Sequence, residues 1–576
     1  MKYFEDKLRY ILKKELNLDN VDIEIPPDSK LGDYALPCFS LSKIFKKSPQ
    51  IIAIELRDNL NNNNEIKKYF ELVKADGPYL NFFVNKSKYI EETLKLIFKK
   101  KCKFGKKKKE KIVVLIESPG PNTNKPLHLG HLRNILLGQS LFNMTNFIGE
   151  KAHLVNIVND RGVHICKSML AYQKFGDKLT PEKTGIKSDH FVGDFYVKYN
   201  QLEKTNPEVE KEIQEMLIKW ERGDKEILRL WRQMNKWALS GFKETYKRLN
   251  FKTKDYFESK IYLKGKEIVL DGLKRGIFQK DENGAIIVDL SKEGLGKKVL
   301  LRSEGTAVYI TQDIYLAKLR YDEYKFDKMI YVVGNEQEYH FKVLFEIFKK
   351  LKWPFADKCY HFAYGMVALP EGKMKSREGK VIDADNLIDQ VVEEAKNEIK
   401  KRYPNLSENE INQRAELIAL SAIKFFFLKY DPMKDFVFNP NESLSFEGET
   451  GPYVEYAYAR INSVFKKFLE NKKVNLEDYI KDANLSLLKK INEFELSKLL
   501  SNFPEIIENS SKKMNPSILA RYLIDLVKAF GSFYQNNPII SSDEELTKAR
   551  LYLTYCVQIV IKLGLNLLGI KEISEM

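Results

Sequence analysis

Short apolar runs alternate with longer stretches of helical periodicity through the middle of the chain. The run IVVLIES at 112–118 is rich in β-branched residues, and similar runs follow at 152–158, 285–290, 307–311 and 328–334. Each has the length and composition of a buried strand. Because helical segments lie between several of these runs, the pattern predicts a doubly wound, parallel α/β sheet.

The first hundred residues predict a separate small α/β domain, which we place at 1–105. Helical periodicity runs through 2–16 and 48–60, and YLNFFV at 79–84 has the pattern of a strand. The lysine-rich stretch KKKCKFGKKKKEK follows at 99–111. Like charges at this density resist packing, so we expect a linker or an exposed arm there. A solvated connector and a segment that contacts phosphates are both compatible with this composition.

Two further regions are helical throughout. The segment at about 168–260 is polar, and its apolar stripe around Trp237 has the spacing of a helix-hairpin core. We interpret it as a helical insertion into an α/β domain at 106–404. From 405 to 576 long helical patterns predominate, and no strand pattern of comparable strength occurs. This last region is predicted to be an all-α bundle.

Charge and cysteine usage add expectations about partners and compartment. Lys and Arg number 96 against 80 Asp and Glu, a net charge of +16 that favours a polyanionic partner. A generally lysine-rich composition explains the same excess, so charge alone does not decide for nucleic acid. Five scattered cysteines exclude a zinc knuckle and a disulfide framework, so we expect a reducing compartment and no structural metal. Without a signal peptide or an apolar span, we expect a cytoplasmic protein that does not contact membranes.

The most informative stretch is IESPGPNTNKPLHLGHLRN at 116–134. A strand ends, a Pro/Gly/Asn loop turns the chain, and a helix opens at His128. His128 and His131 are three residues apart, so both project from one face of the first turn, where the helix N-terminus attracts anions. Gly130 leaves room for a flat ring against the backbone. Taken alone, the pair is either two ordinary polar helix residues or two donors to a phosphate that gains charge.

HLGH after such a loop resembles the nucleotide-binding signature of class I aminoacyl-tRNA synthetases. That family has a Rossmann-type catalytic domain and a second signature on a downstream loop, and EGKMKSREGK at 371–380 resembles the second signature. Two signatures in this order are hard to obtain by chance. The resemblance implies contacts of both signatures with ATP, which binds as its Mg²⁺ complex. The residues so assigned are His128, Gly130, His131, Lys373, Met374, Ser376 and Arg377.

The second signature departs from the family pattern at two positions. Lys375 stands where the pattern has serine, and Ser376 stands where it has its second lysine. Arginyl-tRNA synthetases commonly tolerate this loss, and a lysine just before the first signature is thought to compensate. Lys125, three residues before His128, fits that place. Both Lys125 and Lys373 are therefore candidates for the contact with the leaving phosphate.

Three segments narrow the resemblance to the arginyl enzymes: the loop before the first signature, RSEGTAVYITQDIYLAKLR at 302–320, and YVVGNEQEYHF at 331–341. A guanidinium presents five donors in a planar fork, so a selective site needs carboxylates, neutral acceptors and an aromatic wall. The resemblance supplies them as arginine-binding residues: Glu117, Asn122, Tyr309, Asp313 and Gln337. It implies that Asp313 takes the guanidinium and Glu117 helps hold the amino acid. Spacing does not decide between the two acids, and each residue taken singly also fits a packing role.

Both ends of the chain extend the resemblance. GDYALPCFSLSK at 32–43 and ADGPYLNFFV at 75–84 resemble the extra N-terminal domain of the family, which touches the elbow of the tRNA. LSFEGETGPYVEYAYARINSV at 444–464 resembles the entry to its anticodon-binding domain. Tyr453 and Arg460 would contact tRNA(Arg) there, because aromatics and arginine can stack on unpaired bases.

The resemblance implies an arginine–tRNA ligase. It would form arginyl-adenylate from L-arginine and ATP, transfer the arginine to the terminal adenosine of tRNA(Arg), and act as a monomer. A tRNA-binding protein without catalysis is one alternative, and a cysteinyl-type synthetase is another, although the latter selects its substrate with zinc.

In the anticodon-binding region, Tyr456 and Tyr458 have the spacing of a buried helix seam, and we assign them to packing.

Overall fold

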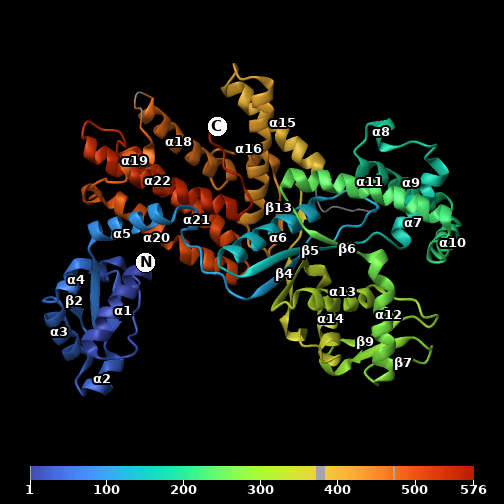
Figure 1. Ribbon diagram of the computed structural model, residues 1–576, viewed down its shortest axis with the longest axis horizontal. Helices are drawn as coiled ribbons and strands as arrows, with labels where there is room; N and C mark the ends of the chain where they lie inside the picture. The colour runs from blue at the N-terminus through green and yellow to red at the C-terminus, as the bar shows by residue number, and fades with distance from the viewer. Residues whose placement is uncertain (1, 371–382, 471, 473) are drawn as a thin grey trace.

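The computed structural model describes the 576-residue chain apart from residues 1, 371–382, 471 and 473. The chain forms an N-terminal α/β module, a central α/β domain that carries two inserted modules, and a C-terminal helical bundle (Figure 1). Four residues predicted to contact ATP lie outside the described residues: Lys373, Met374, Ser376 and Arg377.

The N-terminal module is built on a three-stranded antiparallel sheet of order β1-β3-β2. The helices predicted at 2–16 and 48–60 and the strand predicted at 79–84 are confirmed. Its strands are β1 (Tyr34–Pro37), β2 (Phe70–Asp76) and β3 (Tyr79–Val84). Its helices are α1 (Lys2–Leu16), α2 (Phe39–Phe45), α3 (Pro49–Leu60), α4 (Asn64–Tyr69) and α5 (Lys86–Lys100).

The central domain contains a five-stranded parallel sheet of order β11-β10-β4-β5-β6, as the alternating pattern predicts. Its strands are β4 (Val113–Glu117), β5 (Lys151–Val158), β6 (Lys254–Phe257), β10 (Lys328–Gly334) and β11 (Cys359–Tyr364). Val114 and Ile116 face a core that includes α6 (Leu129–Phe147), whereas Leu115 faces a second core with α13 (Tyr309–Tyr324) and α14 (Glu338–Lys350). Helices therefore cover both faces of the sheet.

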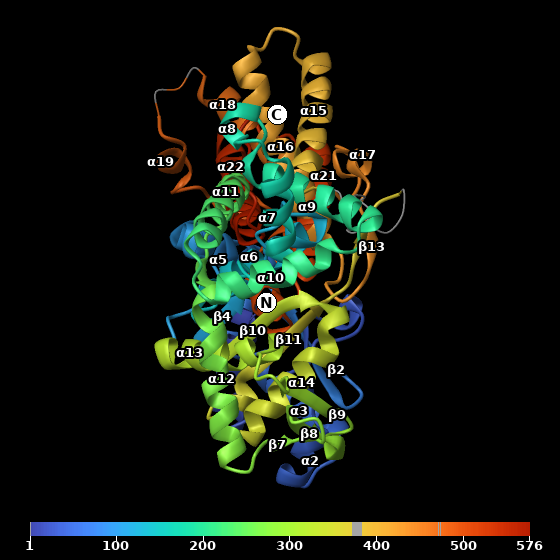
Figure 2. The same cartoon turned by 90° about the vertical axis from the view of Figure 1, so that its right-hand side faces the viewer.

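One predicted strand belongs to a different sheet. The run at 285–290 forms β8 (Ile286–Leu290), which pairs antiparallel with β7 (Gln279–Lys280) and β9 (Gly296–Leu301). This small sheet follows α12 (Glu258–Lys274) and packs beside α13 and α14 (Figure 2). The prediction that 285–290 belongs to the parallel sheet was therefore wrong. An apolar run indicates that a strand is buried, but it does not indicate which strand it pairs with.

The strand predicted at 307–311 is also wrong. Only Ala307 makes an isolated bridge, to Leu301, and helix α13 begins at Tyr309. The hydroxyl of Thr311 accepts the N–H of Val308 at 3.2 Å and donates to the carbonyl of Leu300, which fixes the first helical turn. A capping interaction of this kind overrides the β-branched composition of the run.

The helical insertion lies between β5 and β6 and has a core of its own. It consists of α7 (Val163–Phe175), α8 (Pro181–Thr184), α9 (Ser188–Thr205), α10 (Val209–Glu221) and α11 (Lys225–Leu249). Met234 and Trp237 are buried in it, as the apolar stripe predicts. The insertion projects to the right of the sheet in Figure 1.

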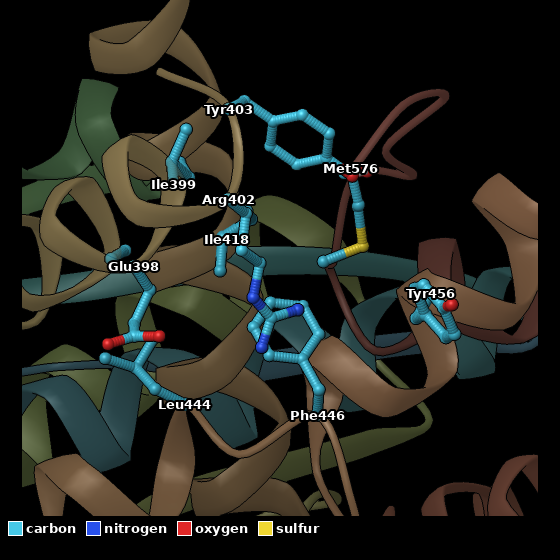
Figure 3. Close-up of a pocket in the computed structure, with 10 residues that line it drawn as sticks. Glu398, Ile399, Arg402, Tyr403, Ile418, Leu444, Phe446, Tyr456 and Met576 are labelled. Atoms are coloured by element: carbon cyan, nitrogen blue, oxygen red, sulfur yellow. Dashed lines mark hydrogen bonds between the residues drawn. The ribbon is translucent and has the colours of Figure 1, made fainter.

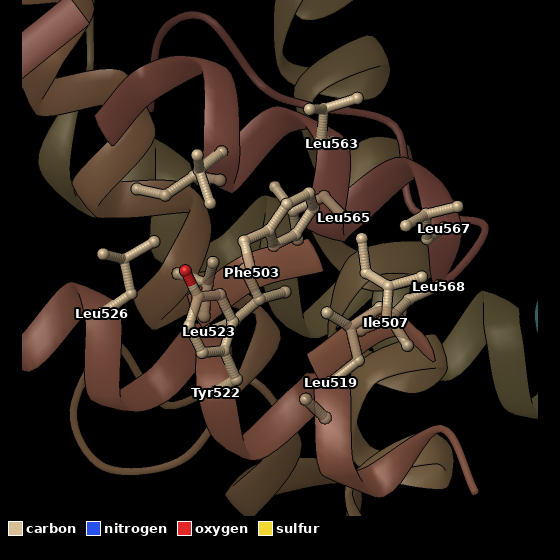
Figure 4. Close-up of a cluster of buried hydrophobic side chains, with 14 of the residues drawn as sticks. Phe503, Ile507, Leu519, Tyr522, Leu523, Leu526, Leu563, Leu565, Leu567 and Leu568 are labelled. Carbon is tan, nitrogen blue, oxygen red and sulfur yellow. The ribbon is translucent and has the colours of Figure 1, made fainter. Parts of the chain in front are cut away.

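The C-terminal region is helical, as predicted, apart from β13 (Phe436–Val437), which pairs with β12 (Val367–Ala368). Its longer helices are α15 (Ala384–Arg402), α16 (Glu408–Lys429), α18 (Gly451–Leu469), α20 (Ile491–Lys512), α21 (Ser517–Asn536) and α22 (Glu544–Leu567). Phe503, Leu523 and Leu565 belong to the apolar cluster of this bundle (Figure 4). In the part of the chain that the structure describes, no helix could span a membrane.

The lysine-rich stretch is partly packed rather than a free linker. Phe104 is buried and stacks on Phe503 of α20, with ring centroids 6.0 Å apart. Lys107 pairs with Glu508 at 2.7 Å, and Lys101 pairs with Glu477. One buried ring and two ion pairs therefore attach this stretch to the C-terminal bundle, which the charge density did not predict.

Candidate active site

The loop between β4 and α6 is held by the neighbouring strand β5. The N–H of Gly120 donates to Asn156 Oδ1 at 2.9 Å, and Thr123 donates its N–H to the carbonyl of Asn159. Gly120 has φ +74°, a left-handed conformation that favours glycine over a residue with a side chain. The loop thus keeps a narrow turn that delivers the chain to the start of α6.

His128 and His131 occupy the N-terminus of α6, as predicted. The rings lie 3.8 Å apart between centroids, at an interplanar angle of 32°. His128 is the residue before the helix, and its Nδ1 accepts the N–H of Gly130 at 3.1 Å. The Nδ1 of His131 accepts the N–H of His128 at 3.1 Å. A neutral imidazole whose Nδ1 accepts carries its proton on Nε2, so each ring presents one N–H donor.

Burial keeps both imidazoles neutral. It lowers the pKa of His128 to about 3, with the charge of Lys125 as a second cause. Burial lowers the pKa of His131 well below its ordinary value, helped by His128 and Lys125. The pair therefore supplies hydrogen-bond donors rather than cations, at a helix end that already favours anions.

Lys125 supplies a cation beside the two histidines. It lies three residues before His128, and burial lowers the pKa of its ammonium group. The inserted helix α9 holds this segment, since a Cβ on Gly193 would lie 2.6 Å from Cδ of Pro126. The backbone of this segment is thus held beside the histidines by a close contact with α9.

A cavity of about 660 Å³ opens above the carboxyl ends of the parallel strands. Ligands of doubly wound sheets bind in this position. Every described residue that we predict to contact ATP or arginine lines it: Glu117, Asn122, Lys125, His128, Gly130, His131, Tyr309, Asp313 and Gln337. Residues from three separate segments, 117–131, 309–313 and 337, therefore meet in one site.

The two acids of the predicted arginine pocket have different partners. Glu117, at the end of β4, forms a buried ion pair with Arg320 of α13. Burial raises the pKa of the Glu117 carboxyl, and the charge of Arg320 opposes that rise. Asp313 instead accepts a hydrogen bond from Nε2 of His340 at 2.8 Å, and its side chain stays partly exposed. Glu117 is therefore balanced by a fixed cation, whereas Asp313 faces a histidine and the open cavity.

Arg320 belongs to the site as the partner of Glu117, although no motif in the sequence marks it. It follows Tyr309 by eleven residues and Asp313 by seven, so all three share one face of α13. Its side chain is completely buried and its guanidinium lies 5.0 Å from the ring centroid of Tyr256. The helical spacing was visible in the sequence, but the partner Glu117 is 203 positions away.

Arg133, two residues after His131, fastens α6 to the C-terminal region. Its guanidinium donates to the carbonyls of Pro432 at 2.8 Å and Lys434 at 2.9 Å, and it lies 4.7 Å from the ring centroid of Phe436. Burial lowers the pKa of Arg133 to about 10. The helix that carries the histidine pair is therefore anchored to the C-terminal region.

Asp189, His190 and Asp385 lie close enough together to hold a metal ion. The Nζ of Lys187, however, pairs with Asp189 at 3.0 Å and with Asp385 at 2.8 Å. His190 also faces Asp383 at 3.2 Å. Burial disfavours the charged form of His190, but its hydrogen bonds to Asp383 and Asp385 raise its pKa to about 10. Two cations already compensate the carboxylates, so the donor set does not fit a divalent metal.

Models of known protein families match the chain along nearly all of its length. Residues 93–440 match the family model of the class I tRNA synthetase (R) catalytic domain. Residues 2–84 match the arginyl tRNA synthetase N-terminal domain, and 454–576 match the DALR anticodon-binding domain. The chain belongs to the class I arginyl-tRNA synthetases.

Relatives and solved structures of this synthetase family are similar over the full chain. Arginine–tRNA ligases of Treponema denticola and Borrelia duttonii are 48% and 44% identical, covering 97% and 98% of this chain and 95% and 96% of theirs. The arginyl-tRNA synthetase of Thermus thermophilus superposes with a TM-score of 0.79 at 27% identity, with 100% of both chains covered. The Plasmodium falciparum enzyme gives 0.75 at 25%, covering 100% and 98%.

The C-terminal domain of this synthetase presents an arginine–aromatic surface on α18. Arg460 lies 4.5 Å from the ring centroid of Tyr456 and 5.3 Å from that of Tyr534. Tyr456 is 38% exposed, so our assignment of it to packing was wrong, whereas Tyr458 is buried as expected. Beside it a pocket of about 40 Å³ is lined by Arg402, Phe446, Tyr456 and the last residue, Met576 (Figure 3).

Proposed function

We propose that this chain ligates L-arginine to tRNA(Arg) in two steps at the cavity above the sheet. The arginine carboxylate attacks the α-phosphate of ATP and releases pyrophosphate. A ribose hydroxyl of the terminal adenosine then attacks the activated carbonyl and releases AMP. The observation that carries the proposal is the convergence of two neutral imidazole donors at a helix N-terminus with two differently paired carboxylates in one cavity.

In the first step, charge grows on the triphosphate of Mg²⁺-bound ATP. The Nε2–H groups of His128 and His131 donate to it, Gly130 lets the adenine and ribose lie against the helix start, and the ammonium of Lys125 follows the departing pyrophosphate. The second-signature residues Lys373, Met374, Ser376 and Arg377 complete these contacts in our proposal. The metal ion enters as part of the substrate, held by the phosphates.

Arginine recognition follows from how the two acids are balanced. Asp313 takes the substrate guanidinium, since its partner His340 is not a fixed cation and its oxygens reach the cavity. Glu117 is already paired with Arg320, so its remaining oxygen accepts from the α-ammonium group. Tyr309 supplies the flat wall for the guanidinium, and Asn122 and Gln337 supply neutral acceptors.

For the second step, tRNA(Arg) contacts both outer domains of a monomeric enzyme. The anticodon stacks on α18, where Arg460 and the tyrosines near it, including Tyr453, offer a cation and aromatic faces. The N-terminal module contacts the elbow of the tRNA.

The test is arginine-dependent exchange of pyrophosphate into ATP, with and without tRNA, followed by charging assays with each amino acid. We expect arginine alone to be activated and charged. Exchange that depends on cysteine or another amino acid contradicts the arginine pocket. Binding of tRNA without any exchange or charging would favour an RNA-binding protein that lacks catalysis.

A further inference from the structure

A second large cavity lies away from the catalytic site, where three parts of the molecule meet. It measures about 730 Å³. Its walls come from the outer side of α6, the turn after α11, helix α16 and the tail that follows α22. The lining residues are Gln139, Phe142, Asn143, Leu154, Arg248, Asn250, Lys252, Leu417, Leu420, Ser421, Lys424, Asn566, Gly569, Ile570 and Lys571.

Among these described lining residues, four are basic and none is acidic. Arg248 is neutralised outside the cavity by Asp389 at 2.7 Å and Glu416 at 2.7 Å. Within the described part of the chain, Lys252 and Lys571 have no ion pair, and both line the cavity and are exposed. The cavity therefore carries positive charge that the protein does not balance, which favours an anion.

Lys424 places one of these charges at the base of the cavity. It is only 4% exposed, and its Nζ donates to the carbonyl of Leu249 at 3.0 Å and to that of Gly569 at 2.7 Å. Two carbonyls use two of its three N–H groups and leave its charge uncompensated. Burial lowers the pKa of its ammonium group to about 8, so an anion in the cavity would stabilise the charged form.

We propose that this cavity binds a phosphate group through Lys252, Lys424 and Lys571. Lysine is a compact point charge that suits a tetrahedral phosphate, and the amides of Asn250 and Asn566 stand nearby as further donors. The bound phosphate joins the catalytic domain to the C-terminal bundle, because Lys252 follows α11 and Lys571 follows α22. The phosphate is either a free small anion or part of an RNA backbone.

The two sources are separated with the double variant Lys252→Glu/Lys571→Glu. Its matched control is Lys274→Glu/Lys280→Glu, which makes the same charge change at exposed lysines on the small antiparallel-sheet module. Titration calorimetry with inorganic phosphate detects a free anion. Binding of tRNA(Arg) over a range of salt concentrations detects an RNA phosphate. Arginine-dependent pyrophosphate exchange checks that both variants are folded, and it tests the ligase proposal separately.

For a free anion, the wild type and the control bind one phosphate that the double variant does not bind, with tRNA affinity equal in both variants. For an RNA phosphate, the double variant binds tRNA roughly tenfold more weakly than the control, and the slope of log affinity against log salt falls by about one for each lost contact. Lys424→Met, which removes the buried amine, should reproduce either loss. Equal behaviour of the double variant and its control in both measurements overturns the proposal.

Discussion

At the scale of single residues, the catalytic site depends on which nitrogen of each histidine carries the proton. Backbone N–H groups occupy Nδ1 of His128 and His131, so the donors point from Nε2. This arrangement could be predicted in part, because three-residue spacing at a helix start is a local feature. The pairing of Glu117 with Arg320 could not, because nothing local connects residues 203 positions apart.

Replacing His131 with alanine should slow arginine-dependent pyrophosphate exchange by about 10²–10³-fold, since one donor to the developing charge is lost. His153→Ala is the matched control, because that histidine lies on β5 and does not line the cavity. An exchange rate for His131→Ala equal to that of the control would contradict the assigned role.

The low pKa values predict how the two histidines behave with pH. The pKa of His128 lies at about 3 and that of His131 well below its ordinary value, so in the free protein neither should titrate between pH 5 and 8. Histidine-selective NMR over that range is the measurement, with His153 and His361 as internal comparisons because they are less buried. A midpoint near 6.5 for either signature histidine would show that it acts as a cation.

At the scale of helices and strands, sequence patterns identified most elements but not their partners. Short apolar runs predicted strands at 285–290 and 307–311, yet only the first is a strand, and its sheet is antiparallel. The edge strand β6 is four residues long and starts with two charged residues, so no apolar run marks it. Strand pairing and helix capping decide the structure of these three segments, and hydrophobic periodicity predicts neither.

Glu455 makes the stability of the C-terminal bundle depend on pH. Burial raises its pKa to about 8. Its carboxyl group accepts hydrogen bonds from the N–H of Ile573 at 2.9 Å and from the hydroxyl of Ser421 at 3.4 Å. The folded pKa lies above the unfolded value, so the stabilisation is complete below about pH 4.5 and is lost as pH rises through about 8. We expect the free energy of unfolding to fall by up to about 1.4 kcal/mol for each pH unit in that window.

Urea denaturation at several pH values measures this slope. Glu455→Gln cannot titrate, so its stability should not fall over the window in which the wild type loses stability. Glu495→Gln, the same change on the exposed face of α20, should keep the wild-type slope. A wild-type slope in Glu455→Gln would place the titrating group elsewhere.

At the scale of the whole molecule, the hydrophobic cores do not follow the boundaries that the sequence suggests. One continuous core joins the N-terminal module, the α6 side of the sheet and the C-terminal bundle. The other face of the sheet and the helical insertion have separate cores. Composition could separate the regions along the chain, but it could not reveal that the first and last of them are packed together.

The packing of Phe104 on Phe503 joins the N-terminal module to the C-terminal bundle, and its contribution can be tested. Phe104→Ala should destabilise the docking of the N-terminal module by about 3–5 kcal/mol, because a buried ring leaves a cavity against Phe503. Trypsin should then cut the lysine-rich stretch faster. Phe39→Ala, at a half-exposed ring of the same module, serves as the control. Equal rates of cleavage in both variants would contradict the docking role.

The contact of α5 with α20 and α22 has a consequence for synthesis on the ribosome. Ile90, Leu94 and Ile97 of α5 are fully buried in the shared core, but α20 begins roughly 400 residues later. At about 5–20 residues per second, the apolar side of α5 leaves the exit tunnel some tens of seconds before its cover is made. The nascent chain therefore exposes the apolar side of α5 through most of translation. Proteins expressed from messages that end before α20 should aggregate.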